Sequence, residues 1–135
     1  MVEHETLQQV AARLAERVNP AFVILFGSVA KGTARADSDL DIAYYAEDVL
    51  SGYDRFLLAG ELAELAGRDV DLVNLREVDP VFAVQIFSTG KRILCRDDNE
   101  FIKQRMRAYS MYATLNEQRA GILEAVKKRG SVYGE

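Results

Sequence analysis

The chain has 135 residues, the length of one domain, and its 49% hydrophobic and 28% charged residues are typical of a globular protein. Its formal net charge of −4 argues against binding along a nucleic-acid backbone, which requires a basic face. A single cysteine excludes an internal disulfide and a zinc site built on thiolates.

The sequence shows no signal for a membrane or for export. No apolar run approaches the roughly 20 residues that span a bilayer. The first residues (MVEHETLQQV) lack the basic and apolar regions of a signal peptide. We therefore expect a cytoplasmic protein that contacts neither a membrane nor nucleic acid directly.

The first third of the chain predicts one helix and two strands. Apolar residues recur at intervals of three and four over residues 5–18, which indicates a helix that ends at Asn19-Pro20. Residues 21–26 (AFVILF) are branched and aromatic, typical of a buried strand. Small and polar residues at 27–38 predict a turn with room for one short helical turn, and residues 39–46 predict a second strand.

The middle of the chain continues the alternation of predicted helices and strands. Residues 53–66 have helical spacing, and Gly67 is their expected C-cap. Residues 69–75 (DVDLVNL) alternate acidic and aliphatic side chains and predict a third strand. Residues 80–89 open with proline at the first position of a helix, and residues 91–95 predict a short final strand.

The last part of the chain is helical in pattern. Apolar residues return at intervals of three or four from Asp97 to about Arg129, with a weak stretch at 116–121 where we expect a bend or break. Helices that alternate with short strands indicate an α/β (α+β) domain with one mostly buried sheet and a C-terminal helical extension.

The stretch FGSVAKGTARADSDLD contains two features that suit phosphate chemistry. Gly27 and Ser28 end a strand and enter a turn, where free backbone N–H groups and a hydroxyl can bind phosphate oxygens. Asp39 and Asp41 lie two residues apart in a strand, so both side chains point to one face and form a hard-oxygen site for Mg²⁺.

A third carboxylate can join this pair if the second and third strands are neighbours. Asp69 and Asp71 repeat the same spacing, and we prefer Asp71 because aliphatic residues flank it while Asp69 lies at the strand edge. Gly-Ser turns and Asp-x-Asp pairs are each common on solvated surfaces. Three carboxylates that face a phosphate-binding turn, however, predict a two-metal phosphoryl-transfer site.

These residues resemble a known family. Gly27-Ser28, ten intervening residues, Asp39-Leu40-Asp41 and then Asp71 resemble the nucleotidyltransferase superfamily that includes polymerase β. The similarity is greatest to the minimal nucleotidyltransferases (MNT) and covers about residues 5–96. It implies a polymerase β-like fold with a short mixed sheet, in which residues 1–96 form the catalytic domain and residues 97–135 a helical extension of the same unit.

The resemblance also assigns roles to individual residues. Asp39, Asp41 and Asp71 would be the catalytic and metal-binding carboxylates and would hold two Mg²⁺ ions. Gly27 and Ser28 would hold the phosphates of ATP. Lys31 stands where many relatives have arginine, and it can neutralise a phosphate without a two-pronged contact.

Minimal nucleotidyltransferases of this length commonly act as antitoxins of type VII-like pairs with HEPN-domain toxins. The resemblance therefore implies an enzyme that transfers AMP from ATP to a tyrosine hydroxyl of a HEPN ribonuclease and inactivates it. Two alternatives remain open. One is an antitoxin that masks its toxin without catalysis, and the other is a nucleotidyltransferase for small molecules of the aminoglycoside type.

Overall fold

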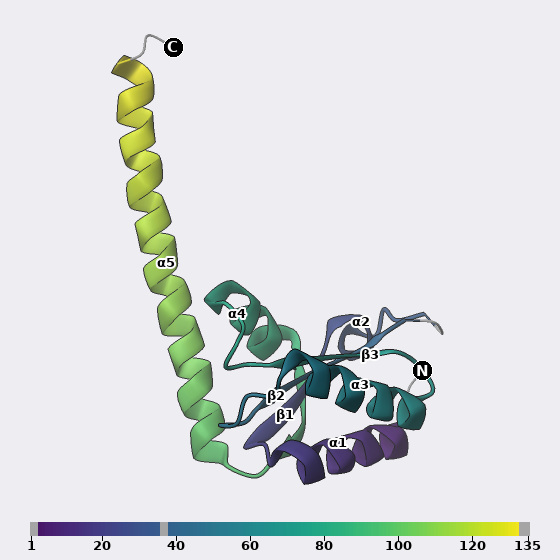
Figure 1. Cartoon of the computed structure of the whole chain (residues 1–135). Helices are drawn as coiled ribbons and strands as arrows, with labels where there is room; N and C mark the ends of the chain where they lie inside the picture. Colours follow the sequence, from purple (N-terminus) through teal and green to yellow (C-terminus); the bar gives the residue numbers. More distant parts are fainter. Residues whose placement is uncertain (1–2, 36–37, 133–135) are drawn as a thin grey trace.

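Four short strands form one mixed sheet at the centre of the fold (Figure 1). The computed structural model describes residues 3–35 and 38–132, and for residues 128–132 only the backbone. The strand order is β3-β2-β1-β4. Strand β1 is antiparallel to both of its neighbours, while β2 and β3 are parallel. The strands are β1 (Phe22–Phe26), β2 (Leu40–Tyr45), β3 (Val70–Asn74) and β4 (Lys91–Cys95).

Helices cover both faces of this sheet. Helices α1 and α3 pack on one face, and α4 with the beginning of α5 packs on the other (Figure 1). The short helix α2 follows β1 directly and contacts β2. The helices are α1 (His4–Val18), α2 (Gly27–Lys31), α3 (Gly52–Ala66), α4 (Pro80–Thr89) and α5 (Asp98–Val132). The α/β architecture with a mixed sheet and a C-terminal helix, expected from the sequence, is confirmed.

The two-residue period of the strands decides which side chains reach which face. In β1, Phe22, Ile24 and Phe26 face α4 and α5, while the residues between them face α1 and α3. In β2, Leu40 belongs to the core beneath α1 and α3. The neighbouring residue Asp41 therefore lies on the face that α4 and α5 cover only in part.

The ends of the helices follow the predicted signals. Asn19 closes α1 in the left-handed conformation (φ 47°), and Gly67 closes α3 in the same way (φ 70°). Pro80 begins α4, and the Asp79 carboxylate caps it by accepting the N–H of Phe82 at 2.8 Å. Local residue chemistry thus sets these boundaries within one or two positions of the expected ones.

The expected break at residues 116–121 is wrong. Helix α5 runs without interruption over 35 residues, which corresponds to about 50 Å. Glu117, Gln118, Arg119 and Ala120 are good helix formers, and a single Gly121 costs only about 1 kcal/mol in a helix interior. The good helix formers outweigh the glycine.

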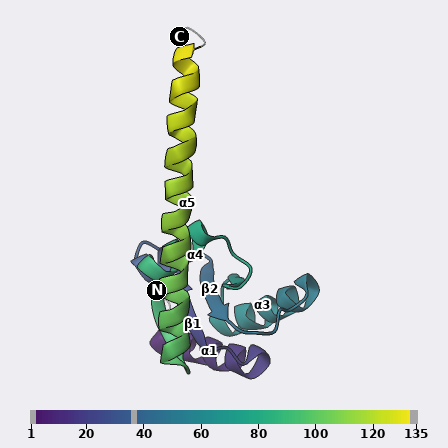
Figure 2. The same cartoon turned by 90° about the vertical axis from the view of Figure 1, so that its left-hand side faces the viewer.

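Aromatic contacts attach the beginning of α5 to the sheet. The Phe101 ring lies edge-on to Phe22 with 5.0 Å between centroids, and edge-on to Phe87 of α4 at 5.6 Å. Beyond this contact the helix leaves the body and projects as a free arm (Figure 2). Among the described residues, no helix combines the length and apolar character needed to span a membrane.

Candidate active site

The turn between β1 and α2 lies directly against one of the predicted acids. Gly27 begins α2 with φ 76°, a left-handed conformation that favours glycine. A Cβ at Gly27 would collide with the Oδ2 atom of Asp41 and lie 2.9 Å from its Cγ atom. The predicted phosphate-binding turn and the predicted carboxylate pair therefore meet at this point.

The sheet register brings two of the acids side by side. Asp41 is the partner of Asp71 across the parallel β2–β3 pair, and of Phe26 across the antiparallel β1–β2 pair. Adjacent strands lie about 4.8 Å apart, and paired residues point to the same face. Asp39 lies two residues before Asp41, just ahead of β2. The condition that β2 and β3 be neighbours is thus met.

The acids influence one another electrostatically. Burial raises the pKa of Asp41 above its usual value, and the negative charges of Asp71 and Asp39 raise it further. Asp69 is not among the groups that shift the Asp41 pKa. The preference for Asp71 over Asp69 agrees with the finding that Asp71, and not Asp69, shifts the pKa of Asp41. The roles of Asp39, Asp41 and Asp71 as metal ligands and catalysts stay predictions.

Backbone hydrogen bonds hold the chain on either side of these residues. The Ser28 carbonyl accepts the N–H of Thr33 at 3.0 Å, and Gly32 closes α2 in the left-handed conformation. Farther along, the Arg68 guanidinium donates to the Ser38 carbonyl at 3.1 Å. Arg68 thereby ties the approach to Asp39 to the β3 side of the sheet. These hydrogen bonds could not be predicted from the sequence, because each depends on a turn or on a tertiary contact.

Ser28 and Lys31 both belong to α2. No side chain caps the beginning of this helix, so its first N–H groups are available to an anion. Lys31 lies four residues after Gly27, which places it on the same side of the helix one turn later. This placement suits phosphate contacts by Gly27, Ser28 and Lys31, which stay predictions.

The carboxylates are a suitable donor set for Mg²⁺, although they do not form a closed metal cage. Among the described side chains (residues 3–35 and 38–127), no three Asp, Glu, His or Cys side chains converge tightly enough to hold a metal ion by themselves. Mg²⁺ commonly binds through one or two carboxylates together with water and substrate phosphates. Burial raises the pKa of Asp41 most, and the charges of Asp71 and Asp39 raise it further, so a bound cation would favour the ionised carboxylate.

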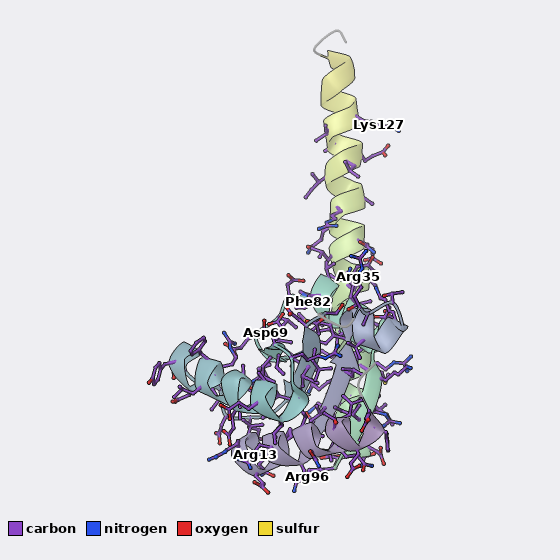
Figure 3. All side chains as sticks on the ribbon, turned by 90° about the vertical axis from the view of Figure 1, so that its right-hand side faces the viewer. Arg13, Arg35, Asp69, Phe82, Arg96 and Lys127 are labelled. Carbon is purple, nitrogen blue, oxygen red and sulfur yellow. The ribbon has the colours of Figure 1, made fainter. Side chains whose placement is uncertain are left out.

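Phe82 is linked to the acids through one intervening residue, Phe26. Phe82 of α4 packs edge-on against Phe26, with ring centroids 5.6 Å apart, and Phe26 is the strand partner of Asp41. Figure 3 shows Phe82, Arg35 and Asp69 at one end of the body, and Arg13 with Arg96 at the opposite end. The sequence places Phe82 within the predicted helix 80–89, and no local signal reveals its packing against Phe26.

Three hollows of the described structure lie away from the predicted acids. None of these three is lined by Asp39, Asp41 or Asp71. One of them, with a volume of about 570 Å³, lies between α4 and α5, and Phe82 is one of the residues that line it.

The sequence matches the family described as "Polymerase beta, Nucleotidyltransferase" over residues 8–99. This match covers more than half of the chain and includes every residue of the site described above. The chain belongs to this family. The polymerase β-like fold and the nucleotidyltransferase class expected from the motif are therefore confirmed.

A curated member of the family is similar along most of the chain. The protein adenylyltransferase MntA of Shewanella oneidensis is 37% identical over 105 residues, which are 77% of this chain and 74% of MntA. The expected similarity to minimal nucleotidyltransferases is confirmed.

Solved structures of similar proteins are toxin–antitoxin complexes. One is a toxin–antitoxin with AMP-PNP, with 32% identity, a TM-score of 0.75 and coverage of 89% of this chain and 98% of that chain. Another is a tri-AMPylated Shewanella oneidensis HEPN toxin in complex with MNT antitoxin, with 28% identity, a TM-score of 0.76 and coverage of 93% and 99%.

Proposed function

We propose that this nucleotidyltransferase is an antitoxin that transfers AMP from ATP to a tyrosine hydroxyl of a cognate HEPN ribonuclease toxin and inactivates it. The observation that carries the proposal is the contact between Gly27 and Asp41, with Asp71 as the strand neighbour of Asp41. A phosphate-binding turn and acidic oxygens meet there, as AMP transfer requires.

The relatives support the choice of nucleotide and acceptor. MntA of Shewanella oneidensis is named a protein adenylyltransferase, one similar structure contains AMP-PNP, and another contains a tri-AMPylated HEPN toxin. By analogy with these proteins, ATP is the donor substrate and a HEPN-domain toxin is the partner of this chain.

Each residue of the site has a task in the transfer. The N–H groups at Gly27 and Ser28, with the Lys31 ammonium, hold the triphosphate so that its α-phosphorus faces the acids. The tyrosine oxygen attacks this phosphorus in line, the bond to the β,γ-phosphates breaks, and pyrophosphate leaves. Asp71 accepts the phenolic proton.

Asp39 and Asp41 would hold Mg²⁺, with Asp71 at a second ion, because these carboxylates are hard-oxygen donors. When bound, the metal neutralises the charge of the triphosphate and of the departing pyrophosphate. Without it, the three carboxylates would repel the phosphates that they must receive.

The intact mass of the toxin tests the proposal. The protein is incubated with ATP, Mg²⁺ and the HEPN-domain protein encoded beside it, and the HEPN protein is then weighed. We expect a gain of one or more AMP units with the wild type, and none with the Asp39→Ala/Asp41→Ala variant or in EDTA. A wild-type protein that binds the toxin without changing its mass would contradict the proposal.

A second candidate is an antitoxin that masks its toxin without chemistry, and the free arm of α5 favours it because the arm offers a large surface to a partner. Growth assays separate the two candidates. Catalysis predicts that Asp39→Ala/Asp41→Ala fails to protect cells from the toxin, whereas masking predicts full protection by the same variant.

A further inference from the structure

The distal half of α5 has an amphipathic surface that nothing in the described structure covers. Every side chain from residue 116 to residue 127 is exposed, although Ile122 and Val126 are large and apolar, with exposed fractions of 62% and 56%. Both cartoons show this half of the helix standing clear of the body (Figures 1 and 2).

The apolar side chains are not scattered around the arm. Ala108 is buried against the body, and Val126 lies 18 residues later, which is about five full turns along the same line. Leu115, Arg119 and Ile122 fall within about 40° of that line, and Leu123, with an exposed fraction of 66%, lies about 60° from it. We call Leu115, Arg119, Ile122 and Val126 the distal stripe.

The opposite side of the arm has a different character. Glu117 and Glu124 point away from the distal stripe by about 160–180°, with small residues on either side of them. A helix that carries apolar residues on one side and acids on the other normally buries its apolar side. The distal stripe therefore has the character of a contact surface.

The distal stripe leads to the active site. Leu115 and Arg119 form one wall of the hollow of about 570 Å³, and Phe82 and Gln85 of α4 form the other. Phe82 in turn packs on Phe26, the strand partner of Asp41. The arm also extends from the end of the body where Phe82 lies, since Figure 3 places Lys127 far beyond Phe82 on that side.

From this continuity we propose that the distal stripe and the α4–α5 hollow form one docking surface for a helix of the acceptor protein. The inference rests on the proposed function, and it specifies how the acceptor is held. The docked helix carries apolar residues at intervals of three and four, and a carboxylate opposite Arg119. Within the described part of the chain, Arg119 forms no ion pair, so its charge is available to such a carboxylate.

A protein fits this surface better than the other occupants do. A nucleotide could fill the hollow between Phe82 and Arg119, but it would leave Ile122 and Val126 uncovered. A second copy of the chain could cover the distal stripe, but it would bring no acceptor to Asp41. The acceptor protein accounts for both parts, because it must reach the acids and needs a surface that holds it there.

Two double variants with the same number of new charges test the proposal. Ile122→Glu/Val126→Glu alters the distal stripe, and Ala113→Glu/Ala120→Glu places the same charges on the other side of the helix. All four positions are exposed, and glutamate is a good helix former, so far-UV circular dichroism should report an intact helix for both variants. Calorimetry measures binding to the neighbouring HEPN-domain protein without ATP, and separately binding to AMP-PNP.

We expect Ile122→Glu/Val126→Glu to weaken HEPN binding at least about tenfold, while Ala113→Glu/Ala120→Glu stays within about twofold of wild type. Affinity for AMP-PNP should not change in either variant. Equal HEPN binding by the two variants would overturn the proposal, as would failure of the wild type to bind the HEPN protein.

Two other results would assign the surface to a different occupant and would also overturn the proposal. Loss of AMP-PNP affinity in Ile122→Glu/Val126→Glu, with HEPN binding unchanged, would mean that the nucleotide contacts the distal stripe. The wild type could instead form a dimer that dissociates in the Ile122→Glu/Val126→Glu variant while HEPN binding stays unchanged. That result would mean that a second copy of the chain covers the distal stripe. If the HEPN protein binds through the distal stripe but gains no mass with ATP, the docking surface stands and the proposed transfer fails.

Discussion

The Cβ that Gly27 lacks would occupy the position of the Asp41 carboxylate, so this residue joins the phosphate turn to the acids. We predict that Gly27→Ala lowers the free energy of unfolding by about 1–3 kcal/mol, because alanine tolerates a positive φ poorly and must displace Asp41. AMP transfer should fall at least about a hundredfold. Urea denaturation and the toxin mass assay measure the two effects.

Gly60→Ala is the matched control for this change. Gly60 lies inside α3, and a Cβ there meets no atom within 4 Å. The variant should keep full transfer activity and gain up to about 1 kcal/mol of stability, since alanine favours a helix interior. A Gly27→Ala protein that behaves like Gly60→Ala would contradict the assigned contact between Gly27 and Asp41.

The raised pKa of Asp41 predicts that the stability of the fold depends on pH. Burial first, and the charges of Asp71 and Asp39 after it, raise its folded-state pKa above the ordinary value of 3.8. The folded protein therefore binds more protons than the unfolded chain between 3.8 and the raised pKa, and stability falls as the pH rises through this window. At neutral pH and without a divalent cation, the ionised Asp41 destabilises the fold.

We therefore predict that Asp41→Asn is more stable than wild type at pH 7 in EDTA, and that this difference disappears well below pH 3.8, where Asp41 is neutral in both states. Urea midpoints at the two pH values measure the effect. Added Mg²⁺ should narrow the difference at pH 7 by stabilising the wild type. A difference of equal size at both pH values would show that the effect comes from packing and not from charge.

The candidate site could be predicted where it depends on local spacing. The two-residue period of a strand predicts that Asp39 and Asp41 share one face, although β2 begins one residue after Asp39. Asp71 required one further condition, that β2 and β3 pair, and only the fold decides this. Phe82 could not be foreseen, because its packing against Phe26 depends on how the chain crosses the sheet between β3 and α4.

At the scale of elements, two helix caps of similar geometry differ in what they position. Ser51 Oγ accepts the N–H of Asp54 at 3.0 Å and begins α3, while the Asp79 carboxylate begins α4, the helix that carries Phe82. We predict that Ser51→Ala and Asp79→Ala each lower the free energy of unfolding by about 0.5–2 kcal/mol. Only Asp79→Ala should also slow AMP transfer, by several-fold.

Thermal melts and the toxin mass assay separate these two effects, and Ser51→Ala serves as the control for a general loss of stability. If both variants slow transfer equally, then the beginning of α4 has no special part in the reaction. The comparison therefore tests whether Phe82 must be held in place, without changing Phe82 itself.

Most element boundaries followed from the sequence because caps, prolines and periodicity act over a few residues. Helix α5 is the exception, since Asn116 and Gly121 suggested a break that the good helix formers between them prevent. Its direction could not be predicted either. The direction is set by the packing of Phe101 between Phe22 and Phe87, which are distant in the sequence.

At the scale of the whole molecule, the body carries the candidate active site, and the arm of α5 carries the proposed docking surface. The body brings Gly27, Asp41 and Asp71 together at one end of the sheet, and none of the three hollows of the described structure is lined by the acids. The arm of α5 leaves the body beside α4, which lies between the arm and α2 (Figure 1). An arm with exposed apolar side chains suits an enzyme whose acceptor is a folded protein.

If the arm serves only to bind the acceptor, then a chain that ends after Arg119 should keep its stability and its affinity for nucleotide but lose affinity for the HEPN protein. The side chains from Ala120 to Lys127 are all exposed, so their removal should change the melting temperature by no more than about 2 °C. The shortened protein keeps Leu115 and Arg119 in the α4–α5 hollow, and its affinity for AMP-PNP should equal that of wild type. Binding to the HEPN protein should weaken at least about tenfold, because Ile122 and Val126 are lost.

Differential scanning calorimetry and titration calorimetry measure these three quantities on the same preparation, with Ala113→Glu/Ala120→Glu as the control for a full-length arm of altered charge. A melting temperature more than about 5 °C lower would mean that the distal arm packs on the body or on a second copy in solution. Because distant, unpacked surface contributes little to stability, an unchanged melting temperature together with lost HEPN binding would assign the arm to recognition alone.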